Sequence, residues 1–176
     1  PAEKAGTLPS REWKRARFER REDQAWYPGE TIITGIGQGY LQTTPLQLAH
    51  ATATIAARGR RFRPTMVAAY TDAATGETRI REPVELQRVE VSDEAFWDDT
   101  IANMTAVMQE PMGTARRTAQ GAPFQIAGKT GTAQVINIPQ GEEYDVDEVD
   151  ERHRHHALFI AVAPAEAPTI AVAVIV

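Results

Sequence analysis

The sequence predicts an α+β fold in which helices pack on a central antiparallel sheet. Helical periodicity occurs at residues 44–59 and again from residue 92, and β-leaning apolar runs occupy 125–135, 157–163 and 169–176. The sequence PAEAP at 164–168 separates the last two runs and is typical of a hairpin connection. Three adjacent antiparallel strands with helices on their faces are therefore expected.

Composition indicates a packed globular domain and excludes several kinds of function. The 176 residues are 42% hydrophobic and 24% charged, which suits one domain of ordinary size. The net charge of −5 gives no electrostatic reason to expect nucleic acid or an anionic membrane as a partner. The absence of cysteine excludes disulfides, thiolate catalysis and zinc–thiolate sites.

The sequence contains no signal peptide and no apolar run long enough to span a bilayer. Its last eight residues, 169–176, form an apolar run with no polar residue after it. Natural domains seldom stop inside a buried strand, so we expect a fragment of a longer protein.

Residues 1–30 form a charged, loop-rich lead-in, and 31–176 carry the helices and strands. Positive and negative side chains alternate at short spacing in the lead-in, which predicts a solvated face rather than an anion-binding patch. The positive residues are Arg11, Lys14, Arg15, Arg17, Arg20 and Arg21.

The first helix has clear start and stop signals. Thr44 suits the cap, Pro45 the first helical position, Gln47 completes a capping box, and Gly59 ends the helix. His50 lies within the periodic stretch and receives no role, because a lone helical histidine is usually a packing or surface residue. The expected apolar contacts are Leu48, Ala51, Ile55 and Ala56.

Two short strands, at about 66–70 and 78–81, are expected to meet through a turn at Thr75 and Gly76. The second helix is expected to begin at Ser92, whose hydroxyl would cap it, with Asp93 and Glu94 complementing its positive end. PMGTA, at 111–115, then breaks the helix. The expected core contacts of this second helix are Phe96, Ile101, Met104 and Met108.

Two glycine-containing motifs resemble nucleotide loops but fail on spacing. GIGQG at 35–39 has Tyr40 where G-x-G-x-x-G needs its last glycine, and no strong apolar strand precedes it. Gly128-Lys129-Thr130 would need a glycine where Pro123 stands, and a helix should follow instead of Gly131 and a β-leaning run. Lys129 is therefore expected on a strand.

Strand geometry gives this second motif another meaning. Side chains alternate in direction, so Lys129 and Gly131 would lie on one face and Thr130 and Thr132 on the other. At a cleft, such hydroxyls and a backbone N–H can bind a carboxylate or carbonyl, and the ammonium supplies positive potential. Gly131 would let a peptide-like substrate approach the backbone, as in binding by strand addition.

Lys-Thr-Gly is the third element of the S-x-x-K, S-x-N, K-T-G set of penicillin-recognising acyltransferases. Over nearly the whole chain the sequence resembles the class B penicillin-binding proteins, most of all the elongation-type group called penicillin-binding protein 2. LPSREWK at 8–14 adds to this closer resemblance. The other shared blocks are WYPGET at 26–31, GIGQG followed by TTPLQLA, GTA at 113–115, IAGKTGTAQV at 126–135 and HALFIAVAP at 156–164.

The resemblance implies the fold of penicillin-binding transpeptidases and serine β-lactamases, with 1–176 as the C-terminal part of a transpeptidase domain. It implies that Lys129 supplies positive charge toward the middle-motif serine and the substrate carboxylate. Thr130 and Thr132 would donate hydrogen bonds to that carboxylate, and the Thr132 N–H would be half of an oxyanion hole. Gly131 would keep the strand open to substrate. The alternative is that Lys129 is only an edge-strand lysine that opposes aggregation.

The nucleophile that the family uses is not found in this sequence. Ser10 is followed three residues later by Trp13, and Ser92 by Ala95, so neither begins S-x-x-K, and no S-x-N occurs. In the family both elements lie upstream of the matched region. The fragment alone is therefore expected to be inactive.

The implied parent is a serine-type D-Ala-D-Ala transpeptidase that cross-links peptidoglycan stem peptides in cell-wall elongation and is acylated by β-lactams. The resemblance places it at the periplasmic face of the bacterial inner membrane, beside a membrane glycan polymerase, with no cofactor, metal or nucleic acid. A serine β-lactamase or β-lactam sensor would share the Lys-Thr-Gly strand, but would not ordinarily carry WYPGET and GIGQG at this distance. A noncatalytic cell-wall scaffold would be favoured if the full gene lacked S-x-x-K.

The stretch at 142–156 combines acidic residues with His153, His155 and His156, which are usable metal ligands. Its spacing matches no defined metal site, so it is interpreted as a solvated loop, with His156 at the start of the next strand.

Overall fold

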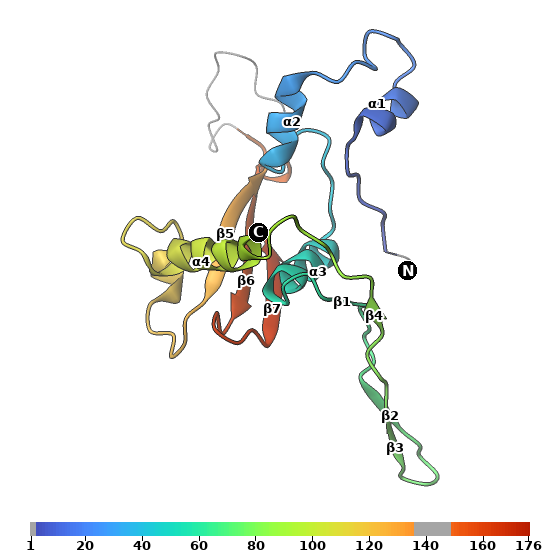
Figure 1. The fold of residues 1–176 in the computed structure, drawn as a ribbon, viewed down its shortest axis with the longest axis vertical. Coiled ribbons are helices and arrows are strands. Elements are labelled where there is room, and N and C mark those ends of the chain that lie inside the picture. Colours follow the sequence, from blue (N-terminus) through green and yellow to red (C-terminus); the bar gives the residue numbers. More distant parts are fainter. Residues whose placement is uncertain (1–2, 136–148) are drawn as a thin grey trace. The chain divides into compact units, whose positions relative to one another are not determined.

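The computed structural model describes residues 3–135 and 149–176. The chain forms two compact units, one from Pro1–Leu48, Gly131–Leu158 and Val174–Val176, the other from Ala49–Thr130 and Phe159–Ala173. Within the described residues, no helix combines the length and apolarity needed to cross a membrane. In chain order the elements are α1 Arg11–Arg17, α2 Pro28–Gly35, α3 Pro45–Ala56, β1 Arg61–Phe62, β2 Ala69–Thr71, β3 Thr78–Ile80, β4 Glu85–Leu86, α4 Ala95–Gln109, the 3₁₀ helix η1 Arg116–Ala119, β5 Ala127–Ala133, the 3₁₀ helix η2 Glu151–His153, β6 His156–Ala163 and β7 Ile170–Ile175 (Figure 1).

The main sheet has three strands in the order β5-β6-β7, as the sequence predicts (Figure 1). The Ala165 N–H donates to the Gln125 carbonyl at 2.8 Å, and Gly131 lies against Leu158, so β5 and β6 run antiparallel. Ala157 and Val176 exchange two backbone hydrogen bonds of 2.9 Å, which makes β6 and β7 antiparallel as well. The predicted hairpin through 164–168 is confirmed, and β6 begins at His156 as expected.

Helices α3 and α4 pack against this sheet and form the core of the second unit. Ala127 of β5 is fully buried in a cluster with Ala56, Met104 and Val162. A neighbouring cluster is built on Met108, with Ala115 and Ala119. Small residues on the strand let the helices approach closely, so one face of β5 is tightly packed against α3 and α4.

Helix α3 has the predicted start. The Thr44 N–H donates to the Gln47 side chain at 3.0 Å, and the Gln47 N–H donates to the Thr44 hydroxyl at 3.2 Å, which is a capping box. Gly59, at φ +86°, closes the C-terminal turn through its N–H to the Thr54 carbonyl. The expected contact of Ala51 is wrong, because Ala51 is exposed.

Threonines take the buried face of α3 instead. Thr52 and Thr54 are both buried, and the Thr54 hydroxyl donates to the His50 carbonyl at 2.8 Å. A helical threonine can satisfy its hydroxyl on the preceding turn, so its methyl group can be buried without an unpaired polar atom. An apolar-only pattern therefore misplaces this face by one residue.

Helix α4 begins later than predicted. Ser92 is not its cap; the Asp93 carboxylate accepts the Ala95 N–H at 2.9 Å at the start of the helix. Phe96, expected in the core, is half exposed, and Trp97 is buried in its place. Trp97 lies on the same helical face as Met104 and Met108, seven and eleven residues further on, and packs against Gly59, whereas Phe96 lies off that face. Met104 and Met108 are buried as predicted.

The predicted pair of short strands is confirmed as β2 and β3, which form an antiparallel ladder from Ala69 with Ile80 to Thr71 with Thr78. Asp72 shapes the turn by accepting the N–H groups of Thr75 and Ala74, and these hydrogen bonds lower the pKa of its carboxyl group. Gly76, at φ +72°, completes the turn.

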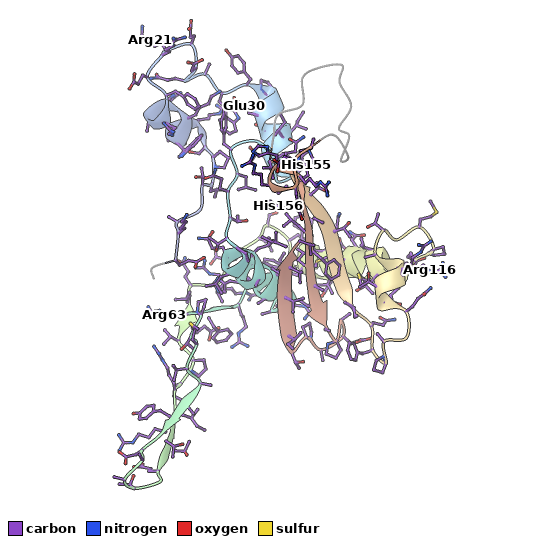
Figure 2. All side chains as sticks on the ribbon, turned by 180° about the vertical axis from the view of Figure 1, so that it is seen from behind. Arg21, Glu30, Arg63, Arg116, His155 and His156 are labelled. Atoms are coloured by element: carbon purple, nitrogen blue, oxygen red, sulfur yellow. The ribbon has the colours of Figure 1, made fainter. Side chains whose placement is uncertain are left out.

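In the first unit, Lys14 overturns the expectation of a uniformly solvated charged face. The residue is only 4% exposed, its ammonium donates to the Ala25 carbonyl at 2.6 Å, and it forms an ion pair with Glu30. Glu30 lies on α2 (Figure 2), where its carboxylate also accepts the Tyr27 N–H at 2.7 Å. The long alkyl stem of lysine allows such burial when the charge is paired.

Burial raises the pKa of Glu30, but the hydrogen bonds from Lys14 and the Tyr27 N–H, together with the charge of Lys14, outweigh it, so the pKa lies below its ordinary value. The ion pair therefore links α1 to the start of α2, the helix that leads into GIGQG.

Replacing Gly128 by Ala should lower the free energy of unfolding by about 1–3 kcal/mol. A Cβ at this position would meet the Phe159 ring at 2.9 Å and the Ile160 carbonyl and Met108 sulfur at 3.0 Å. Chemical denaturation of the full-length protein measures the loss. Gly131→Ala is the control on the same strand, because its Cβ would meet only Leu158 at 3.4 Å. Equal stability of the two variants would contradict tight packing at Gly128.

Lys14→Met should lower the free energy of unfolding at neutral pH by about 1.5–3 kcal/mol, because it removes hydrogen bonds to a charged and a backbone acceptor. Glu30 titrates below its ordinary pKa in the folded state, so its contribution is complete above that ordinary value and is lost as pH falls through the lowered one. The difference between wild type and Lys14→Met should thus shrink in acid. Arg17→Met, an exposed change on the same helix, is the control in the same pH series of denaturant melts.

Candidate functional site

Strand β5 presents the predicted site residues at one edge of the sheet. It pairs with β6 on one side, and within the described residues the strand order places nothing on its other side. Lys129, Gly131 and Thr132 are exposed, and Thr130 is half-buried. The prediction that Lys129 lies on a strand is confirmed, and the phosphate-loop alternative is excluded because no helix begins there.

The backbone of β5 alternates between its partner strand and the open edge. Just before β5, the Gln125 carbonyl accepts the N–H of Ala165, which lies just after β6. In an antiparallel strand the N–H and C=O of one residue point to the same side, and successive residues alternate. Counting from Gln125, the N–H and C=O of Thr130 and Thr132 therefore face the open edge, and both carbonyls accept side-chain donors there.

The Lys129 ammonium also reaches this edge. Its Nζ donates to the carbonyl of Thr130 at 2.6 Å, along its own strand. A positive charge thus lies beside the outward N–H groups of the strand. Together they form an exposed group of hydrogen-bond donors suited to an anionic or carbonyl oxygen.

The two threonines, expected to act alike, have different surroundings. The Thr130 hydroxyl lies 3.1 Å from the hydroxyl of Thr114, in the turn after α4. The Thr132 side chain is exposed and makes no side-chain hydrogen bond among the described residues. Thr130 is therefore held by the helical side of the second unit, and Thr132 is free to meet a ligand.

The carbonyl of Thr132 has a partner that the sequence did not reveal. The side-chain amide of Gln38 donates to it at 2.8 Å. Gln38 lies in GIGQG, between Gly37 at φ +78° and Gly39 at φ +74°. These left-handed conformations explain why glycine occupies both positions.

Sequence reasoning thus missed Gln38, Thr114 and Gly128. The first two lie in GIGQG and GTA, which carried the family resemblance but received no role. Gly128 was treated only as part of a failed phosphate loop, whereas packing excludes a larger residue there. Gly131 was expected to keep the strand open to substrate. It is exposed, and a methyl group on its Cα would make only ordinary contacts with Leu158.

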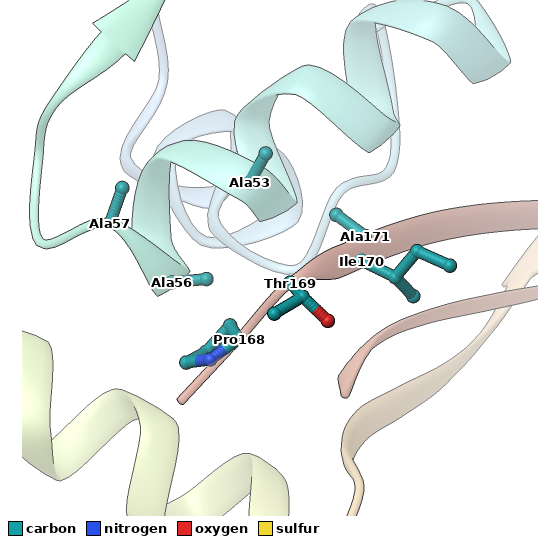
Figure 3. Close-up of a pocket in the computed structure, with 7 residues that line it drawn as sticks. All are labelled: Ala53, Ala56, Ala57, Pro168, Thr169, Ile170 and Ala171. Atoms are coloured by element: carbon teal, nitrogen blue, oxygen red, sulfur yellow. The ribbon is translucent and has the colours of Figure 1, made fainter. Parts of the chain in front are cut away.

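Two other features carry no comparable chemistry. A small hollow of about 140 Å³ lies between the end of α3 and the start of β7, lined by alanines with Pro168, Thr169 and Ile170 (Figure 3). Its lining residues include no charged group, and the Thr169 hydroxyl donates to the Ala163 carbonyl. In the histidine-rich stretch (Figure 2), His155 accepts the Val135 N–H through Nδ1 at 3.2 Å. The acidic residues at 142–148 lie outside the described residues.

Comparison with known proteins identifies the class to which this fold and strand belong. The family described as "Penicillin binding protein transpeptidase domain" matches residues 1–176. The chain therefore belongs to the penicillin-binding protein transpeptidase domain family, as the Lys-Thr-Gly strand and its flanking blocks predict.

Several relatives and solved structures that the chain matches carry the name MrdA or PBP2. The chain is 41% identical over 175 residues to the peptidoglycan D,D-transpeptidase MrdA of Acinetobacter baumannii, covering 99% of this chain and 25% of that protein. The structure of Pseudomonas aeruginosa PBP2 in complex with WCK 5153 has a TM-score of 0.72 at 40% identity and is matched over 97% of this chain and 33% of that one. The complex between PBP2 and MreC from Helicobacter pylori has a TM-score of 0.73 at 28% identity, covering 99% and 28%.

These similarities confirm the predicted resemblance to penicillin-binding protein 2 and the predicted fold. The chain spans about a quarter of the length of the curated relatives it matches, 25% and 26% for two of them.

The Thr114–Thr130 contact can be measured by a double-mutant cycle. Thr114→Val and Thr130→Val should each lower the free energy of unfolding by about 0.5–1.5 kcal/mol, the net value of a hydrogen bond. The double variant should lose little more than either single one, because both remove the same contact. Denaturant melts give the four values, with exposed Thr118→Val as the control. Additive losses would mean that the two hydroxyls do not interact.

Proposed function

We propose that this chain supplies the Lys-Thr-Gly wall of the active site in a peptidoglycan D,D-transpeptidase. The observation that carries the proposal is the open edge of β5, where the Lys129 ammonium and the outward N–H of Thr132 lie on a strand of this family. The relatives named as peptidoglycan D,D-transpeptidases support the reaction and substrate class.

In the proposed reaction, a serine outside these residues attacks the carbonyl between two D-alanines of a stem peptide. The oxygen of the tetrahedral intermediate becomes negative, and the Thr132 N–H donates to it as half of an oxyanion hole. Collapse of the intermediate releases the terminal D-alanine and leaves an acyl-serine. The amine of a neighbouring stem peptide then attacks the ester, which forms the cross-link and frees the serine.

The other site residues bind rather than react. Lys129 supplies positive potential toward the substrate carboxylate, and the hydroxyls of Thr130 and Thr132 donate to it. Gly131 leaves the backbone accessible to an extended peptide, which can align along the open edge of β5. One hydroxyl–carboxylate hydrogen bond contributes about 1.5–3 kcal/mol.

β-Lactams would acylate the same serine as mimics of D-alanyl-D-alanine, consistent with the name of the family. The proposed location is the periplasmic face of the bacterial inner membrane, where the stem peptides are. A membrane glycan polymerase is the proposed partner in cell-wall elongation, and the Helicobacter pylori relative in complex with MreC supports assembly with other proteins.

Two other functions give different results on the full-length protein. A serine β-lactamase would hydrolyse its acyl-enzyme quickly, whereas a transpeptidase would hold it. A noncatalytic scaffold would form none. Relatives named as transpeptidases favour the first proposal over both.

Thr130→Val and Thr132→Val should each slow acylation by a carboxylate-bearing β-lactam by roughly ten- to a hundred-fold in the full-length protein. Valine keeps the β-branched shape that suits a strand and removes only the hydroxyl. Lys129→Ala should be at least as severe, since it removes a charge and a donor. The measurement is the second-order acylation rate constant.

Arg17→Ala, an exposed change on α1, is the control and should acylate as wild type does. Thermal melts separate lost activity from lost stability. If both valine variants acylate normally, or lose activity only in proportion to stability, then β5 has a structural role and the site assignment is wrong.

A further inference from the structure

We infer that Gln38 is a positioning residue for acyl transfer: its side-chain amide holds the Thr132 backbone so that the Thr132 N–H stays directed at the reacting carbonyl. This inference rests on the proposed transpeptidase function. Its basis is the 2.8 Å hydrogen bond from Gln38 Nε2 to the Thr132 carbonyl. Gln38 and Thr132 are 94 residues apart in sequence, so the contact is a tertiary one.

The backbone around Gln38 is itself held in place. The Gln38 N–H donates to the Ile33 carbonyl at 3.0 Å, and the Gly37 N–H donates to the Thr34 carbonyl at 3.0 Å. These bonds continue the last turn of α2 into the loop, which reverses at Gly37 and Gly39. The backbone that carries the Gln38 side chain is therefore held by the end of α2, which limits the positions that the amide can take.

The other end of α2 is fixed as well. Glu30 accepts the Tyr27 N–H and pairs with the buried Lys14. Helix α2 is thus anchored at its start by an ion pair and carries Gln38 at its end. A residue that must orient a peptide group is effective only if its own backbone is held by such contacts.

Thr132 needs such a restraint because of its position on the strand. Its N–H and C=O face the open edge, where no β6 group holds them. The Gly131 carbonyl belongs to the same peptide as the Thr132 N–H and faces β6, so that peptide is held on the β6 side only. A hydrogen bond on the Thr132 carbonyl restrains the same residue from the other side.

Holding a reacting group in its productive geometry lowers the barrier of the chemical step. Loss of the Gln38 amide should therefore slow the acylation step while ligand binding stays nearly unchanged, because the carboxylate contacts come from Lys129, Thr130 and Thr132. A residue with a merely structural role would change activity only through stability.

The test is rapid-mixing acylation of the full-length protein by a chromogenic cephalosporin, analysed for the noncovalent dissociation constant and the first-order acylation rate constant. Gln38→Met has a similar length but no donor, and should lower the acylation rate constant roughly 5- to 30-fold. The dissociation constant should stay within about two-fold. Gln120→Met is the matched control, an exposed glutamine after η1, and should behave as wild type.

Gln38→Glu is the second variant. It keeps the size and polarity of glutamine but places a carboxylate opposite a carbonyl, so the same loss of the acylation rate constant is expected with an intact fold. An unchanged rate constant in both variants, or a loss that follows the melting temperature, would overturn the role of Gln38 alone. A wild type that cannot be acylated would overturn the proposed function, and the role of Gln38 with it.

Discussion

The one-sided pairing of β5 is the constraint on which the rest of the candidate site depends. Because β6 hydrogen-bonds one edge, every second residue of β5 directs both its N–H and its C=O away from the sheet. Close packing fixes the strand behind the site, since Ala127 is fully buried and Gly128 lies against Phe159 and Met108. Lys129 and Thr130 thus follow directly on a closely packed stretch of the strand.

Two side-chain contacts hold residues at the open edge of β5, and each comes from a different loop of the chain. Thr114 meets the hydroxyl of Thr130, and Gln38 meets the carbonyl of Thr132. Both residues follow a helix end, where local backbone hydrogen bonds restrict the loop. Helix ends are suitable places for such contacts, because the helix holds the loop while the side chain remains free to project.

The two lysines at 14 and 129 show how burial divides one residue type between two roles. Lys14 is buried, pairs with Glu30 and joins two helices, so its charge is neutralised by its partner. Lys129 is exposed and bonds only to a carbonyl of its own strand, and it has no carboxylate partner among the described residues. Its charge therefore remains available to an anionic ligand.

The sequence by itself determined the type and order of most elements and the placement of the Lys-Thr-Gly-Thr strand, because these depend on local periodicity, caps and turn residues. The capping box at Thr44 and Gln47 and the turn at Gly76 are local interactions, and both were predictable. Only the tertiary structure decided that Lys14 is buried, that Trp97 replaces Phe96 in the core, and that Gln38 contacts Thr132. Those outcomes depend on segments distant in sequence meeting in space, which no local pattern specifies.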